Sequence, residues 1–433
     1  MTITFIGHGY VGLVTACVFA DFGNNVWVIG HTQEKIDRLK SGDPIIYEAG
    51  LKELLQKNLK ANRLHFTLEY DKAVSESDIV FIAVGTPPST TGAADLSAVF
   101  KVAEDIGTHL KKGFTVVSCK STVTIGTNNK IANIIKSVKP KEADFAVASC
   151  PEFLSQGSAV QNTMHPDRVV IGSDSKEAIS KLLELHKPIG GKRIVTNLAS
   201  AELIKYTANA MLSTKISFAN LIALYSEKTG ADVEAVLDAV GLDKRIGRIF
   251  MNPGVGYGGS CFPKDTKALI QMGKMLGINT TLLEGVDGVN ETARNNFVKK
   301  IEKNSNSNKN IAIWGLSFKP GTDDIREAPA VYIIKDLLTA GFTIHAYDPE
   351  AQEKVKHIFG DKIKYYDSPY LAVEGRSLLA VLTEWNEFKQ IDLQRVKRLM
   401  KNPVVFDGRN IYQPEAMKKL GFRYFSVGRP AII

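Results

Sequence analysis

One cysteine of this chain stands in a setting that suits covalent chemistry. Cys261 follows Gly258 and Gly259, and Lys264 and Asp265 come shortly after it. A thiol can trap an aldehyde as a thiohemiacetal, which becomes a thioester once a hydride leaves, and water then releases an acid. A buried, inert cysteine is the ordinary alternative. The polar, glycine-rich neighbourhood instead favours a thiol that a ligand can approach.

Glycines at the start of the chain indicate where a hydride would be accepted. The apolar run Thr2–Ile6 leads into Gly7-His8-Gly9-Tyr10-Val11-Gly12 and then into a helical pattern. In that context Gly7 allows a tight turn, Gly9 lets the backbone approach a pyrophosphate, and Gly12 allows the helix to pack closely on the sheet. A purely structural glycine turn is the alternative. The predicted dinucleotide contacts here are Gly7, Gly9, Tyr10, Val11 and Gly12.

The second strand pattern lacks a feature that dinucleotide sites of the NAD type usually have. Asn25–Ile29 ends in Gly30-His31-Thr32, where an acidic residue would normally bind the ribose hydroxyls. Without that carboxylate, the repulsion of a 2′-phosphate is removed, and His31, Thr32 and Lys35 are placed to hold one. The sequence therefore predicts NAD as cofactor and keeps NADP as an alternative.

Further polar residues follow strand patterns or share a helix face. Lys205 and Asn209 are four apart in a long helical pattern, so both can point into one cleft. Lys205 could stabilise an oxyanion and lower the pKa of a nearby thiol, and Asp265 could orient Lys205 or a water. Glu152 is a candidate base. An exposed Lys–Asn pair and a helix-starting Pro–Glu pair are the ordinary alternatives.

Two more loops come after strand patterns, where the clefts of parallel sheets open. Thr122 follows Thr115–Ser118 and could hold a water or contact a nicotinamide, and Thr86, in Val84-Gly85-Thr86-Pro87-Pro88, would pass beneath the cofactor. A rigid Pro-Pro loop is the alternative for the second.

The elements that must position these residues alternate between strand and helix. Strands are predicted at Thr2–Ile6, Asn25–Ile29, Ile79–Ala83, Thr115–Ser118, Phe145–Ala148 and Arg168–Ile171, and helices at Val11–Asp21, Gln33–Ser41, Leu96–Leu110 and Ser175–Leu185. Such alternation indicates a mostly parallel sheet with helices on both faces.

The pattern then becomes helical and later alternates again. Helices are predicted at Ala199–Lys228, Asp232–Val240, Lys264–Leu276 and Thr281–Lys303, followed by a polar boundary at residues 304–308. Later strands are predicted at Asn310–Trp314, Thr343–Tyr347, Leu378–Leu382 and Val404–Phe406, with helices at Pro329–Ala340 and Glu350–Phe359. We expect an α/β protein with two Rossmann-like doubly wound domains, 1–198 and 309–433, joined by a helical segment, 199–303. Its long spine helix indicates a homodimer interface, with a simple connector as the alternative.

Composition narrows the functional class. The 433 residues carry a net charge of +8, which suits anionic small substrates and shows no dense basic run for nucleic acid. The four cysteines have no metal spacing, so no metal is predicted, and no apolar run reaches the length of a membrane helix. A cytoplasmic protein is expected.

Taken together, the motifs resemble those of the UDP-glucose/GDP-mannose dehydrogenase family. The resemblance runs over nearly the whole chain and rests on these segments: Gly7 to Gly12, Gly85-Thr86-Pro87-Pro88, Lys120-Ser121-Thr122, Pro151-Glu152-Phe153-Leu154, Lys205-x-x-x-Asn209, Gly258 to Asp265, and Phe318-Lys319-x-x-Thr322-Asp323-Asp324-x-Arg326-Glu327. It implies NAD-dependent, four-electron oxidation of a sugar C6 alcohol to a carboxylate. The loop before Cys261 is most similar to the UDP-glucose branch.

The resemblance also implies roles for individual residues. Cys261 would be the nucleophile, Lys205 and Asn209 would bind the reacting oxygen, and Asp265, Thr122 and Glu152 would serve proton transfer and water activation. The implied cofactor contacts beyond the glycine motif are Gly30, Lys35, Thr86, Thr122, Gln156, Lys264 and Arg326. The implied substrate contacts are Glu152, Phe153, Leu154, Lys205, Asn209, Arg245, Phe250, Met251, Asn252, Pro253, Gly254, Gly258, Lys319 and Arg409, with Arg245 reaching across a dimer.

Two positions depart from the family pattern, and other readings compete. Gly30 replaces an acid, and Gln156 stands where many members have Glu, which leads us to expect retained activity with altered cofactor affinity. GDP-mannose or a UDP-N-acetylhexosamine is the alternative substrate.

Two other classes of protein are alternatives. A two-electron hydroxyacid dehydrogenase would share the first domain without needing Cys261, and a non-catalytic nucleotide-sugar binding protein would bind without turnover.

Overall fold

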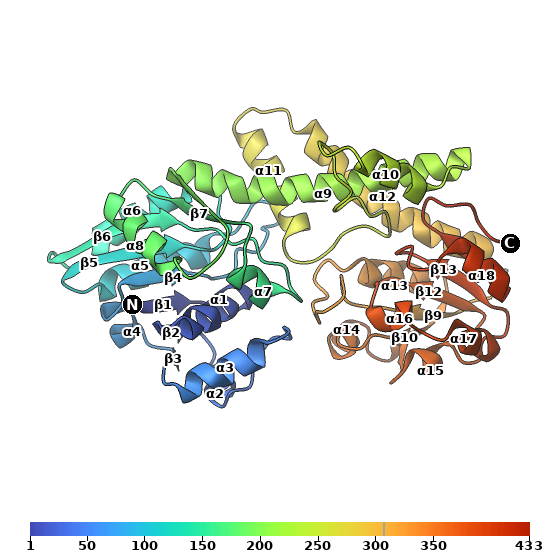
Figure 1. Ribbon diagram of the computed structural model, residues 1–433, viewed down its shortest axis with the longest axis horizontal. Helices are drawn as coiled ribbons and strands as arrows, with labels where there is room; N and C mark the ends of the chain where they lie inside the picture. The colour runs from blue at the N-terminus through green and yellow to red at the C-terminus, as the bar shows by residue number, and fades with distance from the viewer. Residues whose placement is uncertain (306–307) are drawn as a thin grey trace. The chain divides into compact units, whose positions relative to one another are not determined.

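The computed structural model describes residues 1–305 and 308–433 (Figure 1). The chain divides into two compact units, Met1–Ala208 and Asn209–Ile433. The division falls inside one continuous helix, α9 (Leu198–Thr229). Within the described residues, no helix is long and apolar enough to cross a membrane.

The first unit is built on an eight-stranded sheet. Its strands are β1 (Thr2–Ile6), β2 (Asn25–Ile29), β3 (Leu64–Thr67), β4 (Ile79–Ile82), β5 (Gly113–Cys119), β6 (Ala143–Ser149), β7 (Arg168–Gly172) and β8 (Lys192–Thr196). Their order is β3-β2-β1-β4-β5-β6-β7-β8, and among the described strands only the β6–β7 pair is antiparallel. The first six positions have the strand order of a dinucleotide-binding fold.

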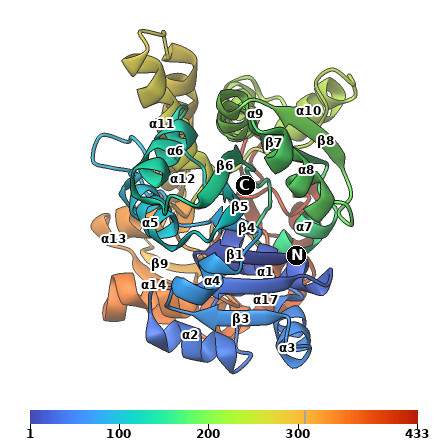
Figure 2. The same cartoon turned by 90° about the vertical axis from the view of Figure 1, so that its left-hand side faces the viewer.

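Helices cover both faces of this sheet because its strands are apolar on both sides. They are α1 (Tyr10–Asp21), α2 (Gln33–Lys40), α3 (Leu51–Lys60), α4 (Asp71–Ser75), α5 (Ser97–His109), α6 (Thr127–Val138), α7 (Ala159–Met164) and α8 (Lys176–Leu185). Alternate residues of β1 enter different cores: Phe5 packs with α1, α3, α7 and α8, and Ile6 packs with α4, α5 and α6. Figure 2 shows α5 and α6 on one side of the strands and α7 and α8 on the other.

The second unit contains three helices and a six-stranded sheet with its own helices. The elements are α10 (Val233–Gly241), α11 (Phe262–Met275), α12 (Thr281–Asn304), β9 (Asn310–Trp314), α13 (Pro329–Thr339), β10 (Thr343–Tyr347), α14 (Gln352–Phe359), the 3₁₀ helix η1 (Gly360–Lys362), β11 (Lys364–Tyr365), α15 (Pro369–Val373), β12 (Leu378–Val381), α16 (Asn386–Lys389), α17 (Leu393–Leu399), β13 (Val404–Asp407), α18 (Pro414–Leu420) and β14 (Arg423–Ser426). The order β11-β10-β9-β12-β13-β14 repeats the first six positions of the other sheet, and each pair of neighbouring strands in it is parallel.

Each sheet has a point where its strand order reverses, between β1 and β4 and between β9 and β12. At such a point the connections leave toward opposite faces, and a crevice opens at the carboxyl ends of the strands. In the first unit, the segments that follow β1, β4, β5 and β6 carry the glycine motif, Thr86, Thr122 and Glu152. The topology therefore gathers these predicted residues at one edge of the sheet.

The predicted fold class is confirmed: two doubly wound α/β sheets, with a helical stretch between them in the sequence. Most element ends agree within about two residues. The starts of β5, β6, α11 and α14 differ by two residues from the predicted starts; α11 begins at Phe262 rather than Lys264, because Pro263 is accommodated in the first turn of the helix. Short edge strands such as β3 and β8 were missed because few of their residues are buried. In the polar boundary, α12 ends at Asn304, and residues 306 and 307 lie outside the described residues.

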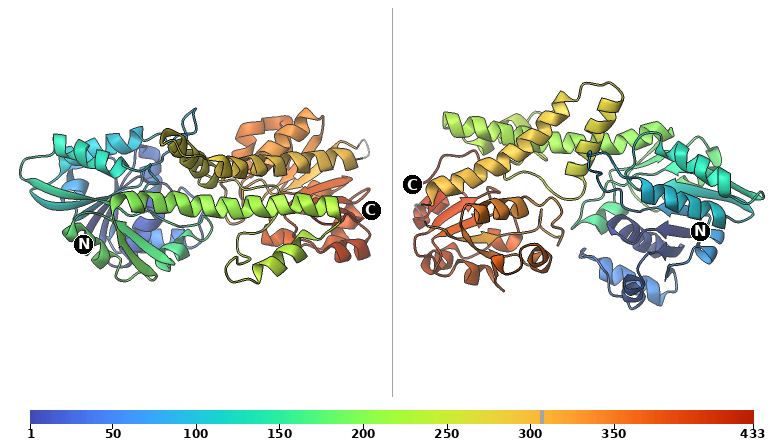
Figure 3. Two further views of the ribbon diagram at one scale, coloured as in Figure 1. Left: turned by 90° about the horizontal axis from the view of Figure 1, so that it is seen from above. Right: turned by 180° about the vertical axis from the view of Figure 1, so that it is seen from behind.

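Helix α9 contains 32 residues and spans roughly 48 Å at the usual rise per residue (Figure 3). Its first turns are held on α6 by Glu202. The carboxylate of this buried side chain accepts hydrogen bonds from Gly126 N (2.7 Å), Asn128 N (2.9 Å) and Asn128 Nδ2 (2.7 Å). Amide groups at a helix start have no partner within the helix, and a negative charge there is favoured by the helix dipole. Glu202 therefore fixes the part of α9 that carries Lys205.

Replacing Glu202 by Gln should lower the stability of the first unit. An amide keeps one acceptor but brings an N–H group against the α6 amides, at a cost of about 1–3 kcal/mol. The thermal midpoint should fall by about 2–4 °C for each kcal/mol lost. Glu177→Gln is the matched control, because Glu177 is an exposed acid in the first turn of α8. Equal midpoints for the two variants would contradict the role assigned to Glu202.

Candidate active site

The glycine motif has two packed positions and one open one. Gly7, with φ of +116°, lies so close to β4 that an added Cβ would be 2.4 Å from Ala83 O. A Cβ on Gly12 would be 1.9 Å from Gly7 O, whereas a Cβ on Gly9 would meet nothing within 4 Å. Gly9 is also the N-cap of α1, where backbone amides point along the helix axis. Gly7 and Gly12 pack against the protein, and Gly9 faces open space. This arrangement fits the binding of a dinucleotide pyrophosphate at the start of α1.

Two predicted cofactor loops are bonded to each other at the carboxyl ends of β4 and β5. The Thr86 hydroxyl donates to Thr122 O (2.9 Å), and the Ser121 hydroxyl donates to Val84 O (2.7 Å). Thr86 is buried. The structure therefore brings Thr86 and Thr122 together beside the strand-order reversal.

Glu152 and Lys205 form a nearly buried ion pair. Lys205 Nζ lies 3.3 Å from Glu152 Oε1, and Glu152 Oε2 accepts a hydrogen bond from Leu154 N (2.7 Å). The ammonium group also lies 5.4 Å from the centre of the Phe153 ring, whose face Arg168 covers at 3.8 Å. Within the first unit, a carboxylate, an ammonium group and an aromatic ring thus meet after β6. A base and an oxyanion-stabilising cation are the roles that this chemistry allows.

The loop with Gln156 is positioned by an acid that the sequence did not single out. Glu48 is buried and accepts hydrogen bonds from Gly157 N (2.7 Å) and Ala159 N (2.8 Å) at the start of α7. Nearby, Tyr10 of the glycine motif donates its hydroxyl to Tyr47 O (3.0 Å). The segment around residues 47–48 therefore ties the glycine motif to the Gln156 loop.

Glu152 also lines a small pocket whose walls are partly polar and partly apolar. Lys120 Nζ donates to Cys150 O (3.3 Å), and Cys150 Sγ lies 3.9 Å from His186 Nε2. Burial, followed by the Lys120 charge, lowers the pKa of His186 to about 3, and burial raises the pKa of the Cys150 thiol. Both groups are therefore neutral near pH 7. Cys17, Cys119 and Cys150 are buried in the core, and all four cysteines are free thiols.

In the second unit, Cys261 is the exposed cysteine. It is the N-cap residue of α11, a helix of 14 residues, where the helix dipole favours negative charge. In the first turn, Asp265 is 1% exposed and accepts hydrogen bonds from Asn209 Nδ2 (2.6 Å) and Lys264 Nζ (2.5 Å). The structure thus brings Asn209, Lys264 and Asp265 together one turn beyond Cys261.

The predicted substrate loop, residues 250–258, is fixed from several sides. Asn220 accepts from Gly254 N (2.8 Å), and Asn290 accepts from Tyr257 N (2.8 Å). Phe250 has a φ of +65°, an unusual conformation for a non-glycine residue that the neighbouring contacts impose.

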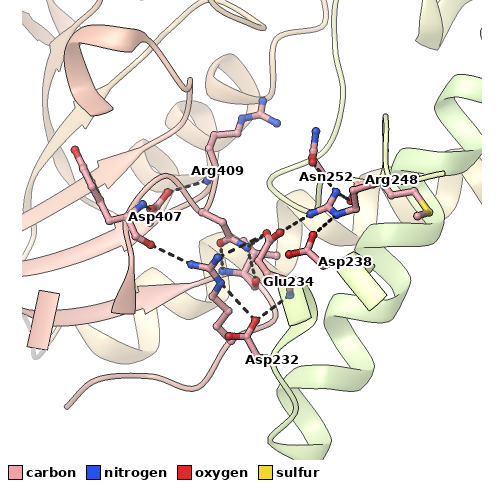
Figure 4. Close-up of polar contacts among 12 residues, drawn as sticks. Asp232, Glu234, Asp238, Arg248, Asn252, Asp407 and Arg409 are labelled. Atoms are coloured by element: carbon pink, nitrogen blue, oxygen red, sulfur yellow. Dashed lines mark hydrogen bonds and ion pairs between the residues drawn. The ribbon is translucent and has the colours of Figure 1, made fainter. Parts of the chain in front are cut away.

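Arg248 holds the start of this loop and was missed by sequence reasoning. Its guanidinium group pairs with Glu234 (2.5 Å) and Asp238 (2.7 Å) on α10, and it also donates to Asn252 Oδ1 (2.7 Å) and to Met251 O (Figure 4). Five N–H donors in a fixed fork allow one side chain to bind both helix and loop.

The same loop packs on two further predicted contacts. Arg409 donates to Leu382 O (2.9 Å), at the end of β12, and to Gly256 O (3.0 Å), while Gly259 N donates to Arg326 O (2.9 Å). A Cβ on Gly258 would meet Glu327 O at 2.1 Å, so this approach requires glycine. The segment from Phe318 to Arg326, which includes Lys319, therefore lies against the loop that leads to Cys261.

Arg245 lies apart from these contacts. Its side chain is 89% exposed and pairs with Asp243 (2.6 Å). Gly30 follows β2, and Lys35 lies in the first turn of α2. The predicted catalytic residues fall into two sets, one in each compact unit. Among the described residues, no group of three or more metal-ligating side chains could hold a metal ion.

A doubly wound fold, a glycine motif at a helix start and an exposed cysteine beside a buried acid define a dinucleotide-dependent oxidoreductase. Family models agree with this class. Three descriptions of the UDP-glucose/GDP-mannose dehydrogenase family match the chain: the NAD binding domain over residues 1–190, the central domain over 199–292 and the UDP binding domain over 312–414. The chain therefore belongs to the UDP-glucose/GDP-mannose dehydrogenase family.

Individual relatives are similar over nearly their whole length. UDP-glucose 6-dehydrogenase TuaD of Bacillus subtilis is 46% identical over 432 residues, which cover 99% of this chain and 94% of the relative. UDP-glucose 6-dehydrogenase of Pseudomonas aeruginosa is 42% identical over 99% of this chain and 98% of the relative. The solved structure of a UDP-glucose dehydrogenase from Pyrobaculum islandicum has a TM-score of 0.93 at 36% identity, covering 99% of this chain and 98% of that one.

Alanine at Gly9 and at Gly12 should have opposite consequences. Gly12→Ala places a methyl group against backbone and should destabilise the first unit by about 1–3 kcal/mol or more, seen as a lower thermal midpoint. Gly9→Ala meets no protein atom, so the midpoint should stay within about 1 °C while dinucleotide binding weakens, measured by calorimetry. Unchanged dinucleotide affinity in Gly9→Ala would contradict the site.

Proposed function

We propose that this protein is a UDP-glucose 6-dehydrogenase, which oxidises the C6 alcohol of UDP-glucose to the carboxylate of UDP-glucuronate. Cys261 carries the proposal: it is the exposed thiol of the chain, placed at the start of α11 with Asp265 one turn on. Relatives named UDP-glucose 6-dehydrogenase share 42–46% identity over nearly the whole chain.

The reaction consists of two oxidations and one hydrolysis. A bound nicotinamide dinucleotide supplies the hydride acceptor for each oxidation. The alcohol loses a hydride and a proton to become the aldehyde. Cys261 Sγ then bonds to the aldehyde carbon, and loss of a second hydride and a proton leaves the thioester. Water attacks that carbon, the carbon–sulfur bond breaks, and the acid and the free thiol are released.

The predicted residues divide the remaining tasks. Lys205 and Asn209 bind the reacting oxygen and stabilise its negative charge. Glu152 activates or positions the water that hydrolyses the thioester, and its pairing with Lys205 keeps both side chains ordered. Thr122 orients that water, and Asp265 fixes Asn209 through the 2.6 Å hydrogen bond.

The second unit supplies contacts to the sugar nucleotide. Residues 250–258 wrap the substrate, and Lys319 and Arg409 contact the diphosphate and uridine side. The match of residues 312–414 to the family's UDP binding domain supports this assignment. Phe153, Leu154 and Gly258 complete the substrate contacts. Gln156 is assigned as a cofactor contact, and Lys264 and Arg326 are assigned as cofactor contacts near the nicotinamide side.

The three predicted domains, 1–198, 199–303 and 309–433, correspond on this proposal to cofactor binding, dimerisation and sugar-nucleotide binding. The homodimer is supported by α9, on which Met211, Phe218 and Tyr225 recur every seven residues and are 58%, 48% and 64% exposed. A partner helix would bury such a stripe. Arg245 then reaches the partner's substrate. Four free thiols support the reducing cytoplasm as the compartment.

The ratio of reduced cofactor to product tests the mechanism. With UDP-glucose, wild-type protein should release two reduced cofactors per UDP-glucuronate, counted by absorbance against chromatographed product. Cys261→Ser should lose at least about 1,000-fold of acid formation, because a serine hydroxyl is almost entirely un-ionised at neutral pH and is then a far poorer nucleophile than a thiolate. Cys150→Ser is the control, since Cys150 is buried and neutral. One reduced cofactor per product, or a fully active Cys261→Ser, would favour the two-electron class. Turnover only with GDP-mannose or a UDP-N-acetylhexosamine would change the assigned substrate.

A further inference from the structure

Gly30 follows β2 at the position where an acidic residue would bind the ribose, and other side chains occupy the space that such a residue would need. A Cβ on Gly30 would lie 2.7 Å from Ile36 Cδ1 and 3.2 Å from His8 Nδ1. Ile36 belongs to the core of the first unit and is buried against α1 and β2. A ribose-binding carboxylate at this position is therefore both missing and sterically opposed.

His8 points an unused polar atom toward the same place. The residue is 4% exposed, and within the described residues its Nδ1 has no hydrogen-bond partner. Burial, followed by the charges of His31 and Lys35, lowers the pKa of His8 to about 4, so the ring is neutral near pH 7. Buried polar groups are nearly always bonded, and a neutral imidazole protonated at Nδ1 can donate to an anion. An unsatisfied donor here indicates a ligand oxygen.

His31 and Lys35 lie near His8. The His31 ring lies 4.8 Å from the His8 ring, and His31 Nδ1 is bonded to the Thr32 hydroxyl (2.9 Å). Thr32 is the N-cap of α2, and because its hydroxyl bonds to His31 it does not cap the helix. The first amides of α2 are thereby left to a ligand, and Lys35 lies in the same turn. The acid in this turn is Glu34, an exposed residue that opposes an anion only weakly.

We propose that His8, His31, Thr32, Lys35 and the start of α2 form a subsite for the 2′-phosphate of a dinucleotide, so that the protein binds NADP at least as tightly as NAD. The inference rests on the cofactor site of the proposed function. Phosphates are bound by arrangements of this kind, a helix start with a cation beside it, and the one acid in this turn, Glu34, is exposed to solvent. NAD is bound at the same glycine motif without using the subsite.

Calorimetry on the full chain without sugar nucleotide tests the subsite directly. NADP is compared with NAD, and 2′,5′-ADP with 5′-ADP, which isolates the adenosine end. Each 2′-phosphorylated ligand should bind at least as tightly as its partner. NADP binding that is weaker than NAD binding by more than the error of the measurement would overturn the proposal, as would binding of neither dinucleotide.

Two variants and a control identify the residues responsible. Lys35→Gln and His31→Asn should each weaken 2′,5′-ADP relative to 5′-ADP by roughly tenfold, because each variant loses a hydrogen bond to the phosphate, and the bond from Lys35 is charge-assisted. Lys40→Gln, in the last turn of α2, should leave that ratio within about twofold. An unchanged ratio in both test variants would overturn the assignment. These binding measurements do not depend on turnover. If the protein bound NADP but a separate assay showed no oxidation of UDP-glucose, the proposed function would be wrong and the 2′-phosphate subsite would still be supported.

Discussion

A buried carboxylate costs several kcal/mol unless hydrogen bonds or a cation compensate its charge, and this requirement organises the candidate site. Glu202 is compensated by the amides of α6, and Glu48 by those of α7. Asp265 is compensated by Lys264 and Asn209, and Glu152 by Lys205. Each pairing joins segments that are distant in sequence or adjacent at a helix start. The positions of the predicted functional side chains therefore follow from the need to satisfy these acids.

In the second sheet, the buried carboxylate of Asp407 at the end of β13 is likewise compensated by hydrogen bonds. Burial raises the pKa of Asp407, and hydrogen bonds from Arg409 N (3.0 Å), Tyr412 N (3.0 Å) and the Tyr424 hydroxyl (2.8 Å) act against that effect. The turn after β13 is thereby fixed, and Arg409 leaves it toward the loop before Cys261. The Arg248 network on α10 restrains the other end of that loop. Substrate selectivity on this account depends on a loop held by charged groups on both sides.

Periodic hydrophobic patterns in the sequence predicted the fold, but they could not predict individual contacts between distant residues. Strands such as β1 and β2 are apolar runs next to glycine turns, so their ends were predicted to the residue. Glu202 accepts a hydrogen bond from a backbone amide 76 positions away, and Glu48 from one 109 positions away. No local sequence pattern predicts contacts over such distances. An acid among the apolar residues at the start of α9 was the available signal for Glu202. Gly30 was noticed because a rule for dinucleotide sites names its position, but the packing of Ile36 and His8 into its place required coordinates.

The central claim is that substrate carbon becomes covalently attached to Cys261 during turnover. Glu152→Gln should slow thioester hydrolysis, so its protein mass should rise by one sugar-nucleotide unit after mixing with UDP-glucose and cofactor and quenching in acid. Peptide mapping by mass spectrometry should place the added mass on Cys261, with none on the buried Cys17, Cys119 or Cys150. Acid product formed without any adduct on Cys261, in this variant and in wild-type protein, would contradict the account.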